Sequence, residues 1–319
     1  MKRAYCKLRP IFLIFILALP ALCTASSSQL SGGIDTRFTN TGGKTNRLEL
    51  EGLFLNFRQV FSDEKGDRLI AVGQLDIDNN FADVRCYQTF LQYKGPLGKW
   101  NIRVGHYILP FGLLSDYDSE RLVLQSLELS SLGMKLDTGI SLLGFIGAFD
   151  YAISVSQGMG RNRLADVDDN KLVTGRIGWQ GEDLTVGIST LVGKVLADKD
   201  SPLRVGAGSI SLREKRLGLD IIQYHGPLIF RGELLIGRDE NKTVGGGLIL
   251  AGYALIPKLE VNLKYAHWRK DGNRSFTGAG FTFSMGSGLF LRLADEYQFG
   301  KENKNVATAQ IYYEFARFL

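Results

Sequence analysis

Apolar and polar residues alternate with a period of two over most of the chain. In the segment 259–265 (LEVNLKY), the odd positions are apolar or aromatic and the even positions are polar. The segments 288–300 and 305–319 repeat the alternation. This period is typical of β-strands that have one apolar and one polar face. No long segment shows helical periodicity, so the pattern predicts an all-β protein.

About sixteen such segments can be counted. They are separated alternately by tight turns, such as GPLG at 95–98, and by longer or more charged connections, such as RNRLADVDDN at 161–170. The predicted strands are 29–40, 47–61, 69–80, 83–95, 99–110, 133–147, 149–160, 172–181, 183–195, 211–226, 228–240, 242–257, 259–271, 274–286, 288–300 and 305–319.

Two architectures can use strands of this kind, a soluble β-sandwich and a membrane-spanning barrel. Segments of about 10 to 15 residues are long for a sandwich but suit tilted crossings of a bilayer. A sheet in lipid has to close, because its edge groups find no water there. Many segments end in an aromatic residue, as interfacial girdles would: Tyr93, Trp100, Tyr107, Trp179, Tyr224, Tyr265, Trp268 and Tyr297. We therefore expect a transmembrane antiparallel β-barrel of about 16 strands in a bacterial outer membrane, with short periplasmic turns and long external loops.

The first 25 residues predict the compartment. They contain four basic residues, then the apolar run IFLIFILALPAL and then small residues up to Ala25, which is the order of a secretory signal. We expect a signal peptide at 1–25 and one barrel domain at 26–319. Without the four signal charges the net charge of +5 falls to about +1, so nucleic-acid binding is not indicated. Cys86 is the one cysteine after the signal, which excludes an intramolecular disulfide.

One connection breaks the pattern by its length. The third external connection, 112–132, is acidic and also carries several leucines that could pack against a barrel wall. We expect it to form a constriction loop inside the barrel, and a surface loop without a pore role is the alternative. Its charged residues are Asp116, Asp118, Glu120, Arg121 and Glu128.

The strand that leads into this connection, RVGHYILPFGLL, carries a resemblance to a known family. It is similar to the corresponding segment of the phosphate-selective porins O and P, with Arg103 and Gly105 followed by a Pro110-Phe111-Gly112 turn. The mature chain as a whole resembles the porin superfamily. The resemblance implies a third loop folded into the lumen, a diffusion channel and a homotrimer.

Basic residues are expected on the wall opposite the loop. The alternation points six of them toward the lumen, where they would face the acidic loop and create a transverse field: Arg103, Arg176, Arg216, Arg231, Lys264 and Arg292. Each could instead pair with an acid on a neighbouring strand: Asp220, Glu233, Glu260 or Glu296. Because acids are predicted both in the loop and on the inner face, we do not expect phosphate selectivity. We expect only weak charge selectivity.

The sequence thus predicts a porin for passive diffusion of small hydrophilic solutes or ions, with outer-membrane lipid around it and no cofactor or metal. Two other functions stay open. One is a barrel sheath around an inserted protein partner, and the other is an outer-membrane hydrolase. Against the hydrolase, the three histidines after the signal lie near strand ends, and the motifs HExxH and GxSxG are absent. A Ser–His site built across strands is not excluded by a sequence.

Overall fold

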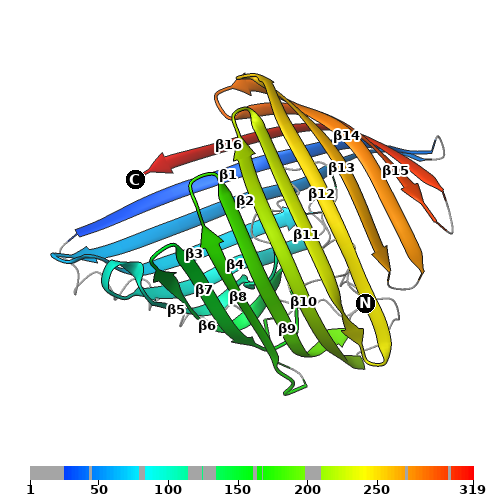
Figure 1. Ribbon diagram of the computed structural model, residues 1–319. Helices are drawn as coiled ribbons and strands as arrows, with labels where there is room; N and C mark the ends of the chain where they lie inside the picture. The colour runs from blue at the N-terminus through cyan, green and yellow to red at the C-terminus, as the bar shows by residue number, and fades with distance from the viewer. Residues whose placement is uncertain are drawn as a thin grey trace.

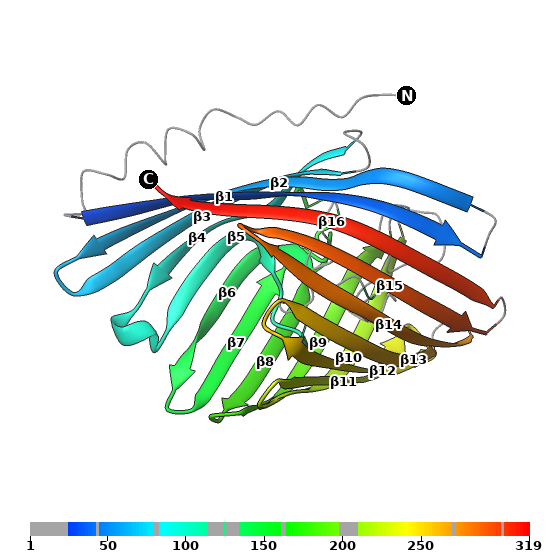
Figure 2. The ribbon, with the colours of Figure 1, turned by 90° about the horizontal axis from the view of Figure 1, so that it is seen from above.

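The computed structural model describes residues 25–42, 45–78, 83–113, 124, 134–160, 164–166, 168–197, 210–269, 272–300 and 303–319. In this part of the chain, antiparallel strands form one closed barrel in sequence order, and the first strand pairs with the last (Figure 1, Figure 2). No helix among the described residues is long and apolar enough to cross a membrane.

The strands of the described residues agree with the sixteen predicted segments. They are β1 (Ala25–Thr41), β2 (Thr45–Asp63), β3 (Gly66–Asp78), β4 (Asp83–Lys94), β5 (Asn101–Ile108), β6 (Leu136–Ile146), β7 (Phe149–Ser156), β8 (Leu172–Gln180), β9 (Leu184–Ala197), β10 (Ile210–His225), β11 (Leu228–Asp239), β12 (Lys242–Ile256), β13 (Leu259–Arg269), β14 (Asn273–Gly286), β15 (Leu289–Phe299) and β16 (Lys304–Phe318). A short 3-10 turn, η2 (Pro96–Gly98), joins β4 to β5.

The two kinds of connection lie at opposite rims. In β1, Ser26 is opposite Phe61 near the end of β2, and Gln29 is opposite Phe318 near the end of β16. Both ends of the barrel sheet therefore lie at the rim that carries the tight turns. The longer connections lie at the other rim, which we call the loop rim. This alternation is what the sequence predicts.

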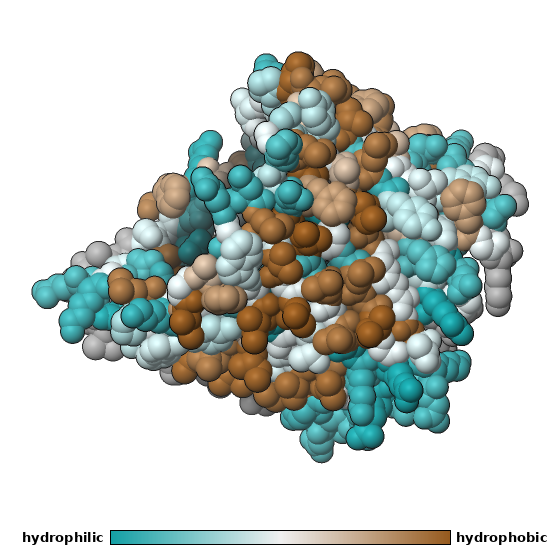
Figure 3. Space-filling view, in the orientation of Figure 1, coloured by the Kyte–Doolittle hydropathy of each residue, from teal (hydrophilic) through white to brown (hydrophobic). Residues whose placement is uncertain are grey.

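The outer face is apolar. Leu234, Ile236 and Leu263 point outward and are 61%, 64% and 58% exposed, whereas their chain neighbours Glu233 and Lys264 are buried. Figure 3 shows a broad hydrophobic band across this side of the barrel. An outward apolar band over a polar interior is the arrangement of a barrel that spans a membrane.

The inner face is less polar than alternation alone predicts. One cluster of buried apolar side chains lies inside the barrel, and Trp268 stacks on Phe276 there with ring centroids 4.0 Å apart. Two of the predicted girdle residues, Tyr107 and Trp268, are in this cluster, so their assignment to the membrane interface is wrong. Tyr93, Trp100, Trp179 and Tyr265 are exposed, as girdle residues must be.

Candidate pore and its constriction

The first residues of the third loop reach the far wall of the barrel. The loop leaves β5, but the Gly112 N–H donates to Ser189 Oγ on β9 at 3.0 Å. The Leu113 N–H donates to Glu233 Oε1 on β11 at 3.2 Å. Ser189 and Glu233 are buried, while their neighbours Ile188 and Leu234 are exposed on the outer face. The start of the loop is therefore bonded to inward-facing side chains four and six strands away from β5.

The Pro110-Phe111-Gly112 motif makes this change of direction. The Phe111 N–H donates to the Leu109 carbonyl at 2.9 Å, which closes a tight turn around Pro110, whose ring has no N–H to satisfy. Gly112 has a φ of 55°, in the left-handed region that favours glycine. Phe111 and Leu113 are almost completely buried in the internal apolar cluster. Packing and hydrogen bonds together fix the start of the loop.

The central part of the loop lies outside the described residues. The five charged residues predicted to form the constriction fall in this part: Asp116, Asp118, Glu120, Arg121 and Glu128. Leu124 is described, and it is 8% exposed. Its Cδ2 lies 2.9 Å from the position that a Cβ on Gly278 of β14 would take. A second point of the loop thus lies close to the wall at β14.

Three of the predicted basic residues are ion-paired to acids on other strands, and two of these pairs, at Arg176 and Lys264, reach the next strand but one. Arg176 donates from Nη2 to Asp220 Oδ1 at 2.7 Å and from Nη1 to Asp150 Oδ2 at 2.8 Å. Lys264 Nζ lies 2.7 Å from Glu296 Oε2. Asp220 and Glu296 are acids that the sequence offered as such partners, whereas Asp150 was not considered.

Arg216 is the third ion-paired residue, and the other three have different surroundings. Arg216 pairs with Asp239 and lies 3.5 Å from Glu214. Arg103 donates twice to Gln92 and lies over the Phe90 ring, and Arg292 donates to Gln310 and lies over the Tyr312 ring. Arg231 is half-buried, and its Nε makes no hydrogen bond. All six lie on inward-facing positions, and three of them are neutralised by carboxylates within the wall.

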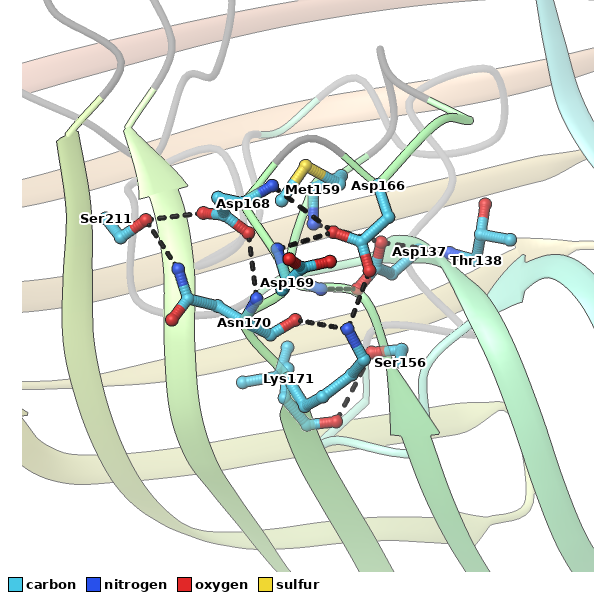
Figure 4. Close-up of polar contacts among 12 residues, drawn as sticks. Asp137, Thr138, Ser156, Met159, Asp166, Asp168, Asp169, Asn170, Lys171 and Ser211 are labelled. Carbon is cyan, nitrogen blue, oxygen red and sulfur yellow. Dashed lines mark hydrogen bonds and ion pairs between the residues drawn. The ribbon is translucent and has the colours of Figure 1, made fainter.

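Polar contacts also shape the connection between β7 and β8 at the loop rim (Figure 4). The buried carboxylate of Asp137, at the start of β6, accepts the N–H groups of Thr138, Gly158, Met159 and Gly160. It therefore ties the end of β7 to β6. Among the described residues, no group of His, Cys, Asp or Glu side chains is arranged to hold a metal ion.

The remainder of this connection is held by charged side chains. Lys171 Nζ lies 2.6 Å from Asp166 Oδ2, and this hydrogen bond holds the pKa of Asp166 below and that of Lys171 above its ordinary value. Burial opposes the shift at Asp168, but hydrogen bonds from Ser211 and Asn170 still keep the pKa of that carboxyl below its usual range. Ser211 belongs to β10, so these bonds join the connection to a neighbouring strand.

The histidines bear on the hydrolase alternative. His106 is buried and lies 3.0 Å from Thr138 Oγ1. His267 lies 2.8 Å from Ser275 Oγ on the outer face. Within the described residues, no carboxylate is hydrogen-bonded to His267, so this Ser–His pair has no acidic third member there.

Comparison with known proteins identifies the fold. No protein-family model and no curated protein matches the chain. Among solved structures, the anion-selective porin from Comamonas acidovorans has a TM-score of 0.71 and 14% identity over 91% of this chain and 100% of its own. The complex of Salmonella typhi OmpF with daunomycin has a TM-score of 0.64 and 12% identity, over 90% of this chain and 97% of that one. OmpTdeltaL8, a loop-deletion mutant of the outer membrane protein OmpT of Vibrio cholerae, has a TM-score of 0.72, with 13% identity over 91% and 100% of the chains. The chain has the sixteen-stranded fold of outer-membrane porins.

Proposed function

We propose that the protein is an outer-membrane porin through which small hydrophilic solutes or ions diffuse passively. The fold provides a closed barrel with an apolar exterior and charged groups on the inner wall. Such a barrel supplies a hydrated path through hydrocarbon, and the solute moves down its own gradient. No cofactor is needed for this activity.

The observation that carries the proposal is the attachment of Gly112 and Leu113 to Ser189 and Glu233. These bonds, from a loop that starts at β5 to β9 and β11, support a loop that enters the space enclosed by the strands. We infer that residues 112–132 narrow this space, and that Asp116, Asp118, Glu120 and Glu128 face the solute path. In a sheath for an inserted protein, this position would obstruct the partner.

The charge selectivity is weak in this proposal. Arg176, Arg216 and Lys264 are balanced by carboxylates within hydrogen-bond or ion-pair distance. Arg103 donates to the neutral amide of Gln92, and the Arg231 Nε makes no hydrogen bond, so among the described residues neither is seen in an ion pair. With the wall pairs balanced and the other inward cations facing an acidic loop, the proposed lumen is close to neutral, so the phosphate selectivity of porins O and P is not part of the proposal.

Recording from planar bilayers tests the constriction. Deletion of 115–130 is expected to enlarge the single-channel conductance, and neutralising the four loop acids is expected to shift the reversal potential in a KCl gradient toward anions. A matched control removes charges of the same sign from the short-turn rim, with Glu64→Gln and Glu182→Gln, and is expected to leave conductance unchanged. If the purified protein forms no channel, the porin proposal is wrong. If channels form but the deletion has no effect, only the constriction is wrong.

Two further properties belong to the proposal, one from the pattern of the first 25 residues and one from the resemblance. The first is cleavage after residue 25, which lies next to residues outside the described part of the chain. The second is assembly as a homotrimer, and one of the solved structures of Vibrio cholerae OmpT is named as a trimer form. Crosslinking in mild detergent checks the trimer, and mass spectrometry of the purified protein checks the cleavage.

A further inference from the structure

A row of basic side chains lies on the outer face at the loop rim, over β9 to β13. Its members are exposed, they alternate with inward residues, and within the described chain none of them is in an ion pair: Lys194, Arg213, Lys215, Arg238 and Arg269. The nearest acid of the adjoining turn, Glu240, accepts the backbone N–H of Arg213. We call this row the basic arc.

The strand register places like charges directly opposite each other in the basic arc. Lys194 of β9 is opposite Arg213 of β10, and Lys215 of β10 is opposite Arg238 of β11. Like charges in directly opposed positions destabilise a sheet. Two such pairs occur side by side on one face, because Arg213 and Lys215 are two residues apart on β10. An anion placed over the four side chains would remove this repulsion.

An apolar groove lies directly below the arc on the same outer face. It has a volume of about 630 Å³, which is within the range of small-molecule sites. Its floor is made by Gly232, Gly245 and Gly247, whose missing side chains leave a depression between Leu234 and Ile249. The glycines of the run VGGGLILAG therefore shape the lipid-facing surface. His267 and Arg269 line the end of the groove that is nearest the arc.

In the part of the chain that the structure describes, this combination is found on one side of the barrel. On the opposite side, outward residues near the loop rim are apolar and exposed, as for Phe38 of β1, Leu48 of β2 and Val84 of β4. In Figure 3, hydrophilic side chains gather at the lower right, beneath the hydrophobic band. A general interfacial girdle would continue around the barrel, whereas a binding site for one kind of lipid is confined to one side.

We propose that this face binds an acyl lipid whose headgroup carries phosphate. The basic arc holds the phosphate groups, and the groove over Gly245 and Gly247 receives an acyl chain. The proposal rests on the membrane placement given above, which puts the loop rim in the external leaflet, but it does not depend on channel activity. Clusters of Lys and Arg at a membrane surface bind anionic headgroups, with each cation contributing separately.

Native mass spectrometry of the purified protein with bis-phosphorylated lipid A tests the proposal. Wild-type protein is expected to retain lipid A but not phosphatidylcholine. The double variant Lys215→Gln/Arg238→Gln is expected to bind lipid A about thirtyfold more weakly, because each cation near a membrane surface contributes roughly fivefold. Lys65→Gln/Lys258→Gln, in turns at the opposite rim, is the charge-matched control and is expected to bind as the wild type does. Heat-modified gel migration shows that each variant is folded.

A second variant separates the acyl chain from the headgroup. Gly247→Leu fills the groove without changing the charge, and its Cβ would meet the end of the flexible Leu234 side chain at 2.8 Å. It is expected to weaken lipid A binding, while inorganic phosphate alone binds neither protein measurably. The proposal is overturned if the double variant and its control bind lipid A equally, or if Gly247→Leu binds as the wild type does. It is also overturned if the double variant changes only the oligomeric state, because this face would then be a contact between copies of the chain.

Discussion

The Leu113 N–H donates a hydrogen bond to Glu233 Oε1 across the barrel, between residues 120 positions apart in the chain. The pair connects a loop that begins at β5 to the inner face of β11. Glu233 is 2% exposed, so its carboxylate is committed to the interior and not to bulk water. In the proposed channel, this contact determines how far the loop stands from the opposite wall.

Replacing Glu233 by alanine is therefore expected to release the start of the loop. Loss of a buried hydrogen bond to a charged acceptor costs about 1.5–3 kcal/mol. Much of this loss is expected to destabilise the local structure at 109–113. Hydrogen exchange of these amides is expected to accelerate, and single-channel current is expected to become noisier. Glu233→Gln keeps an acceptor oxygen in place and is the control, so equal behaviour of both variants would contradict the proposed role.

Gly112→Ala is expected to displace the same contact by steric means. A Cβ at this position would lie 1.8 Å from Glu233 Oε1, and the backbone φ is 55°. Gly147 gives a matched control, since its φ is 62° and a Cβ there would meet nothing within 4 Å. Both substitutions carry a backbone cost of about 1–2 kcal/mol. Only Gly112→Ala is expected to alter the conductance, and it is expected to lower the heat-modification midpoint more than Gly147→Ala does. Equal effects of the two substitutions would show that backbone strain alone causes them.

The facing of the strand residues and the ion pairs within the barrel wall can be predicted from the sequence more readily than the position of the third loop can. Period-two alternation predicts which face of β13 carries Lys264, and it places Glu296 within reach two strands away. The bond from Leu113 to Glu233 has no counterpart in a pattern of nearby residues, because it depends on where a loop lies inside a closed barrel. The apolar inner wall was missed because the run from Val244 to Leu250 is apolar on both faces, and alternation cannot assign it.

The ion pair of Arg176 and Asp220 yields a prediction about selectivity. Arg176→Gln leaves Asp220 and Asp150 without their shared cation, so the reversal potential in a KCl gradient is expected to move toward cation preference. Asp220→Asn is expected to move it toward anions, and the double variant is expected to return near the wild-type value. Removing one member of a buried ion pair also destabilises the protein by about 3–5 kcal/mol. The folded fraction of each variant is therefore purified before recording. If the double variant loses as much stability as the two single variants lose together, the pair is not coupled.

The connection between β7 and β8 is expected to lose order at both extremes of pH. The pKa of Asp166 is lowered by its hydrogen bond from Lys171, so the stabilisation is present above the ordinary carboxyl pKa of about 3.9 and is lost as pH falls through the lowered value. The pKa of Lys171 is raised by the same bond, so the stabilisation is complete below about 10.4 and is lost as pH rises through the raised value.

Hydrogen exchange or limited proteolysis of residues 164–171 measures this loss. Protection is expected to be constant between these limits and to fall at the acid end only below the ordinary aspartate pKa. Lys171→Gln removes the charge that lowers the pKa of Asp166, so in this variant the acid transition is expected to move up toward about 3.9. Asp168, which is held by Ser211 and Asn170 and not by Lys171 alone, keeps part of the connection attached to β10 in the variant. A wild-type acid transition that does not move in Lys171→Gln would show that the ion pair does not order this connection.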